Sequence, residues 1–283
     1  MKRMNVLLLL VLAAAVGLFG CYLIWIHNNL DTVGPVITIE EGILEISVED
    51  PEDALMEGVR AVDDRDGDVT SRVLVESVYG INADNVTTVT YAAFDAAGNV
   101  TKTQRQVRYR DYQSPRFKLY GSLTFARGSG FDLLEYVGAN DVLEGDIRRR
   151  VHATLISDTR SIDSEGTHRV KLQVTSGLGD TQEIVVPVEV YDPEWYAARV
   201  TLTEYMLYLE KGDVFKPRDY LESFQLRGDP INLSRTVPED ITVDIDNEVN
   251  TAVPGVYEVT YTLSQTLNTD TYSGIAKLIV IVE

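Results

Sequence analysis

One pattern of alternating side chains occurs three times in this chain and constrains its fold more than any other feature. The run GVYEVTYTL at residues 255–263 places apolar side chains at every second position, with Glu or Thr between them. The runs GTHRVKLQV at 166–174 and TTVTYAAF at 87–94 show the same alternation. Because successive side chains of a strand point to opposite faces of a sheet, each run predicts a strand with one buried face.

A second apolar strand follows each of these three, and a Gly-Asp turn recurs within each block. Pro115 and Pro193 mark the junctions between blocks. Repetition of this block of strands and turns predicts an all-β chain of three tandem domains after one N-terminal helix. In chain order, we expect a cytoplasmic tail at residues 1–5, a membrane anchor at 6–27, an exit linker at 28–33, and β-domains at 34–111, 112–191 and 192–283.

The N-terminal run between Val6 and Ile26 contains no charged side chain. At about 1.5 Å rise per residue it is long enough as a helix for a hydrocarbon core of roughly 30 Å. Lys2 and Arg3 precede it, and the next basic residue along the chain apart from His27 is Arg60. The positive-inside rule then predicts a single-pass anchor with a cytoplasmic N-terminus and everything after His27 outside the cell.

Two alternatives to a plain anchor helix remain open. A cleaved signal peptide has an apolar region of about 7–15 residues, which is shorter than this run. A lipoprotein signal is suggested by Leu18-Phe19-Gly20-Cys21, where Cys21 is the single cysteine of the chain. Against lipidation, Phe19 is bulky and the chain continues apolar after Cys21.

The charge balance excludes one class of partner. The chain carries 44 acidic against 25 basic side chains, a net charge of −19. Such a chain repels nucleic acid, so we expect no DNA or RNA partner. With one cysteine there is no intrachain disulfide, which argues against most disulfide-rich secreted scaffolds and favours a bacterial surface protein.

Two segments of the first block carry a family resemblance. The sequences GVRAVDDRDGDVT at 58–70 and VTYAAFDAAGN at 89–99 resemble the bacterial immunoglobulin-like repeats of Gram-positive cell-surface proteins. PGVYEVTY at 254–261 resembles the penultimate strand of the same repeats, while the second block departs most, with His168 in place of Tyr257. The resemblance implies immunoglobulin-like β-sandwiches of about seven strands and does not imply a ligand.

Acidic residues cluster in the first block, at Asp63, Asp64, Asp66 and Asp68. Oxygen ligands on a glycine-containing loop suit Ca²⁺, which extracellular modules bind weakly. The spacing does not match a twelve-residue calcium loop, because no Glu closes it. The alternative is a solvated turn whose Asp side chains accept hydrogen bonds from nearby backbone N–H groups. No other cofactor is expected.

Aromatic side chains crowd the second junction, at Tyr191, Trp195 and Tyr196. Exposed together, they would form a patch for stacking sugars or binding a protein. Packed together, they would instead join the second and third domains.

No motif of catalysis is found: the chain has no Gly-x-Ser-x-Gly, no His-Glu-x-x-His and no phosphate-binding loop. We therefore expect a non-enzymatic, membrane-anchored extracellular protein that acts as a surface spacer, scaffold or adhesion element through protein or glycan contacts. A carbohydrate-binding module and an accessory subunit of a membrane complex are the alternatives.

Overall fold

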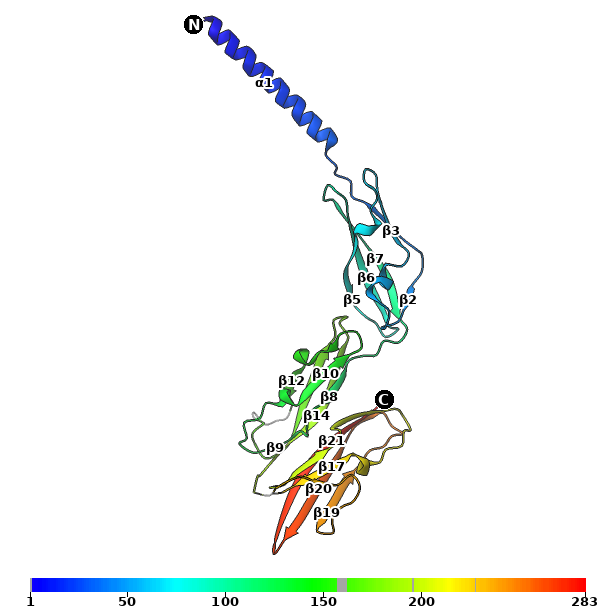
Figure 1. Ribbon diagram of the computed structural model, residues 1–283, viewed down its shortest axis with the longest axis vertical. Coiled ribbons are helices and arrows are strands. Elements are labelled where there is room, and N and C mark those ends of the chain that lie inside the picture. The colour runs from blue at the N-terminus through cyan, green and yellow to red at the C-terminus, as the bar shows by residue number, and fades with distance from the viewer. Residues whose placement is uncertain (1, 157–161, 195, 227) are drawn as a thin grey trace. The chain divides into compact units, whose positions relative to one another are not determined.

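The computed structural model describes residues 2–156, 162–194, 196–226 and 228–283. One helix is followed by strands, so the all-β prediction is confirmed for the chain beyond that helix (Figure 1). Contacts divide the chain into two compact units, Met1–Arg110 and Asp111–Glu283. Each unit is described separately.

Helix α1 (Lys2–Asn29) is 28 residues long and includes the whole of the run predicted as an anchor. The helical form of residues 6–27 is therefore confirmed. Among the helices built from described residues, none has both the length and the apolar character that crossing a membrane requires. The membrane span itself stays a prediction.

The first unit continues as a sandwich of two sheets, with strand orders β1-β3-β4 and β2-β7-β6-β5. The alternation in β6 buries Val89 and Tyr91 between the sheets, each 0% exposed. Between β1 and β2 the chain crosses from one sheet to the other, through Gly42 at φ +111°, a conformation that favours glycine. The strands are β1 (Val36–Ile39), β2 (Leu44–Ile46), β3 (Val59–Asp63), β4 (Gly67–Asp68), β5 (Val73–Tyr79), β6 (Val86–Phe94) and β7 (Val100–Tyr109).

The second unit holds two more sandwiches, which we call the second and third. The second has sheets β8-β10-β11 and β9-β14-β13-β12, and its long strands β13 and β14 bury every second side chain. Pro187, which has no N–H to donate, pairs with Arg169 of β13, and β9 begins to pair with β14 only at Glu189. The strands are β8 (Arg116–Leu119), β9 (Thr124–Ala126), β10 (Val137–Asp141), β11 (Gly145–Asp146), β12 (His152–Leu155), β13 (Gly166–Thr175) and β14 (Thr181–Tyr191).

The third sandwich has sheets β15-β17-β18 and β16-β21-β20-β19. This is the strand order of the other two, so within the described residues one immunoglobulin-like sandwich arrangement occurs three times. Its strands are β15 (Arg199–Leu202), β16 (Met206–Leu209), β17 (Leu221–Gln225), β18 (Ile231–Asn232), β19 (Ile241–Asn247), β20 (Gly255–Leu267) and β21 (Asp270–Val282). Short 3₁₀ helices connect strands at Glu52–Met56, Thr70–Arg72, Leu133–Glu135, Arg148–Arg150 and Pro217–Tyr220.

The second and third sandwiches share apolar contacts. Met206 of β16 and Ile279 of β21, 7% and 1% exposed, belong to the same buried cluster as the core of the second sandwich. Removal of this apolar surface from water contributes about 25 cal/mol per Å² and therefore stabilises the contact between the two sandwiches. This contact creates the grooves described next.

Candidate functional site

A groove lined by five tyrosines lies between the second and third sandwiches, within the second unit. Its volume is about 460 Å³. Polar groups share the lining, among them Ser122, Thr124 and Thr201. Aromatic faces beside a few hydroxyl groups are a surface suited to a ligand that is apolar on one side and polar on its rim. The tyrosines are Tyr120, Tyr136, Tyr191, Tyr196 and Tyr205.

The junction tyrosines are held by the chain that links the two sandwiches. Tyr191 ends β14, and Tyr196 lies in the following segment with its ring edge-on to Tyr191, at 5.4 Å between centroids. Tyr205, just before β16, packs against the apolar cores of both sandwiches. Burial raises the pKa of Tyr191 and of Tyr205 above the ordinary value. Both phenols therefore stay neutral at physiological pH.

Tyr120 is the most exposed aromatic of this groove, at 43%. Its ring lies over Gly138 of β10, where a Cβ atom would come within 2.5 Å of the Tyr120 hydroxyl. The guanidinium of Arg148 lies 4.4 Å from the centre of the same ring. A cation over an aromatic face is attracted to it, so Tyr120 is positioned from two sides.

The structure thus brings Tyr191 and Tyr196 together, as the sequence predicted, while Trp195 lies outside the described residues. Tyr205 packs against both sandwiches, whereas Tyr120, Tyr191 and Tyr196 line a groove, and a binding role for that groove stays a prediction. Tyr120 and Tyr136 also line the groove and were not predicted from the sequence.

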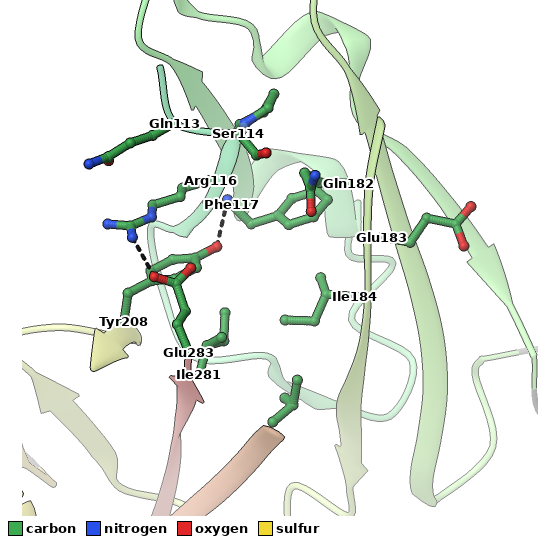
Figure 2. A pocket seen from close by; sticks show the side chains of 12 residues that line it. Gln113, Ser114, Arg116, Phe117, Gln182, Glu183, Ile184, Tyr208, Ile281 and Glu283 are labelled. Carbon is green, nitrogen blue, oxygen red and sulfur yellow. Dashed lines mark hydrogen bonds and ion pairs between the residues drawn. The ribbon is translucent and has the colours of Figure 1, made fainter. Parts of the chain in front are cut away.

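A second pocket, of about 360 Å³, lies in the same unit (Figure 2). Tyr208 reaches across from β16, and its hydroxyl accepts a 2.8 Å hydrogen bond from the backbone N–H of Phe117. Arg116 stacks over the Tyr208 ring at 4.9 Å and pairs with Glu283 near the end of the chain. Burial raises the pKa of Tyr208 to about 12. These contacts fix the wall of the pocket and join the two sandwiches at the same time.

An ion triad also crosses this junction. Lys277 of β21 lies 3.1 Å from Glu189 of β14 and 2.8 Å from Glu258 of β20. Burial acts to lower the pKa of Lys277, but its hydrogen bonds to the two carboxylates outweigh burial and raise it. The lysine is therefore charged and paired with both carboxylates.

The acidic loop of the first sandwich does not gather its four carboxylates in one place. Asp64, Asp66 and Asp68 are exposed; Asp66 pairs with Arg72 at 3.0 Å, and Asp68 accepts a hydrogen bond from the backbone of Thr70. The hydrogen bonds from Thr70 lower the pKa of Asp68. Asp63 differs, because it is buried at 4% exposure. A calcium site made of these four residues stays a prediction. The structure places the Asp63 carboxylate beside those of Asp31 and Asp95 instead.

With this geometry described, the fold of the chain is a tandem array of immunoglobulin-like β-sandwiches. No family model matches the sequence, and no curated protein matches it. Among solved structures, the chain is similar to the extracellular domain of protocadherin GammaB4, at 10% identity and a TM-score of 0.20, with 88% of this chain and 49% of that chain covered.

Two further similarities are of the same kind. For CBM51-2 in complex with GlcNAc and INT domains from Clostridium perfringens ZmpB, identity is 12% and the TM-score 0.23, with 88% and 42% covered. For Drosophila N-cadherin EC1-4, identity is 13% and the TM-score 0.22, with 89% and 67% covered. The chain spans about half the length of the first two structures. These TM-scores are too low to indicate a common function.

Proposed function

We propose that the chain is a non-catalytic adhesion or scaffold protein of a Gram-positive-type bacterial surface, which contacts glycans or proteins through the tyrosine-lined groove of its second unit. The observation that carries the proposal is the groove itself, where Tyr120, Tyr191 and Tyr196 lie beside hydroxyl groups. A pyranose ring offers an apolar face and a rim of hydroxyl groups, which matches this pairing of rings and polar side chains.

The size of the groove supports a short oligosaccharide or a peptide loop. Its volume of about 460 Å³ lies within the range of roughly 300–1,000 Å³ typical of ligand pockets. Tyr120 and Tyr136 come from one sandwich and Tyr205 from the other, so a ligand there would touch both. The acidic chain, at −19, favours neutral or cationic ligands over anionic polymers.

A glycan array probed with the full chain tests the proposal. We expect binding to neutral glycans that Tyr120→Ala and Tyr196→Ala each weaken at least about tenfold, consistent with loss of a stacking contact. Tyr79→Ala is the matched control, because Tyr79 is 66% exposed on the first sandwich and outside the groove. A silent array would leave the scaffold role and remove the glycan role.

Location at the cell membrane is a second part of the proposal and rests on the sequence of residues 6–27. The uncharged run and the preceding Lys2 and Arg3 support an N-terminal anchor with the sandwiches outside. We expect detergent to release the protein from membranes, and we expect salt or carbonate washes to leave it in the membrane fraction. Metabolic labelling with a lipid, compared with Cys21→Ser, separates a plain helix from a lipidated cysteine.

A further inference from the structure

Three carboxylates that are far apart in the sequence converge at one end of the first sandwich. Asp31 lies between α1 and β1, Asp63 ends β3, and Asp95 follows β6. One oxygen atom from each lies within 4.8 Å of the others. Two ligands of one Ca²⁺, each at about 2.4 Å, stand at most about 4.8 Å apart. The spacing therefore suits a shared cation.

The hydrogen bonding of Asp63 is an independent observation that points to a cation. Its Oδ1 accepts hydrogen bonds from the backbone N–H groups of Arg65 and Asp66, both at 2.9 Å. Its Oδ2 is buried and has no hydrogen-bond partner among the described residues. A buried carboxylate oxygen without a partner is costly, and a bound cation would remove that cost.

The other two carboxylates are already oriented. Both oxygens of Asp95 accept hydrogen bonds from Asn99, at 2.7 Å from its backbone N–H and 2.6 Å from its side chain. The same amide donates to the backbone oxygens of Asp31 and Val33, which holds this segment against the sandwich. Arg65 lies 3.8 Å from Asp31, so one positive charge faces three negative ones. The excess of two negative charges matches a divalent ion.

The second sandwich has corresponding residues at the same place, and there the Tyr112 side chain of the protein lies between them. Asp141 ends β10 as Asp63 ends β3, and its Oδ1 likewise accepts two backbone N–H groups. Ser176 stands where Asp95 does, since each donates its backbone N–H to the residue four positions later. The Tyr112 hydroxyl lies 3.2 Å from Asp180 Oδ2 and 3.5 Å from both Asp141 Oδ2 and Ser176 Oγ. A neutral phenol thus lies where the first sandwich gathers carboxylates.

We propose that Asp31, Asp63 and Asp95 bind one Ca²⁺ ion, which ties the segment after α1 to the first sandwich. Oxygen-only ligands select a hard cation, and water molecules would complete the six to eight ligands that Ca²⁺ takes. Asp31 enters from outside the sandwich, so binding of the ion orders this segment.

Calorimetry on the chelator-treated full chain tests the site. Titration to about 10 mM Ca²⁺ should give one binding event per chain, with a dissociation constant of roughly 0.1–1 mM as in extracellular modules. Asp63→Asn and Asp31→Asn should each weaken binding at least about tenfold. Asp64→Asn is the matched control, because Asp64 neighbours Asp63 but is exposed and outside the cluster.

Circular dichroism shows whether each variant is folded. If Asp63→Asn does not fold, Asp31→Asn tests the site in its place. Limited proteolysis should cut the 30–34 segment more slowly with Ca²⁺ than without it, and this protection should be lost in Asp31→Asn. Absence of Ca²⁺ binding in the wild type, or equal dissociation constants in Asp31→Asn and Asp64→Asn, would overturn the proposal.

Discussion

The Nζ atom of Lys277 lies 3.1 Å from the carboxylate of Glu189, and this ion pair joins the third sandwich to the second. The lysine side chain is only 7% exposed and also contacts Glu258 at 2.8 Å. One buried cation therefore pairs with two carboxylates from different sandwiches. Such a contact responds to mutation far more than a surface ion pair does.

Lys277→Ala should lower the free energy of unfolding of the second unit by about 1–3 kcal/mol, because two carboxylates lose their partner. Urea denaturation followed by circular dichroism measures this change. Lys171→Ala is the control: Lys171 pairs with Glu183 at 3.2 Å, but both side chains are more than a third exposed. Its cost should stay below about 1 kcal/mol. Equal costs for the two variants would contradict the structural role of Lys277.

Tyr208 should make the chain sensitive to alkaline pH. Its folded pKa of about 12 exceeds the ordinary 10.0, so the unfolded chain releases this proton first. The contribution is fully present below pH 10 and is lost as pH rises toward 12. Tyr208→Phe should therefore lose stability less steeply than the wild type across that window. Parallel curves from denaturation at successive pH values, with Tyr79→Phe as reference, would contradict this.

Arg105 should be the most sensitive arginine of the first sandwich. It is 8% exposed and donates hydrogen bonds to the backbone oxygens of Glu57 at 2.7 Å and Leu55 at 2.8 Å, and to the Tyr91 hydroxyl at 3.1 Å. Arg105→Met should cost about 2–3 kcal/mol, the scale of hydrogen bonds to a charged group. Arg108→Met removes an exposed pair with Glu45 and should cost below about 1 kcal/mol. Chemical denaturation compares the two variants.

Gly138→Ala should disturb the tyrosine-lined groove without unfolding the second sandwich. The new Cβ would lie 2.5 Å from the Tyr120 hydroxyl, which is the far end of a flexible side chain in a residue that is 43% exposed. Stability should change by less than about 1 kcal/mol, whereas glycan binding should weaken as Tyr120 leaves its position. Thermal unfolding and binding measured on the same sample separate the effects. Unchanged binding would show that Tyr120 does not contact the ligand.

The strands were predictable because their side chains alternate. In β20 the buried Val259, Tyr261 and Leu263 are those that the pattern assigned to the inner face. Sheet membership was not predictable, since the crossing between β1 and β2 depends on pairing between strands that are distant in sequence. Arg105 also escaped prediction, because a buried arginine breaks the rule of apolar inner faces.

The candidate sites show the same division. The loop containing Asp63 stood out by composition, but its partners Asp31 and Asp95 are about 30 residues away in either direction, and only the fold brings them together. Tyr191 and Tyr196 were predicted from their closeness in sequence, whereas Tyr120 reaches the groove from another loop. Local chemistry is visible in a sequence, and convergence of distant residues is not.

In each sandwich a short early strand runs parallel to the last one: β2 beside β7, β9 beside β14, and β16 beside β21. Tension applied to the two ends of such a sandwich drags these strands past each other along their length. The hydrogen bonds between the two strands are then loaded together, in shear, and do not break one after another. A sandwich built this way resists extension when a force pulls its two ends apart.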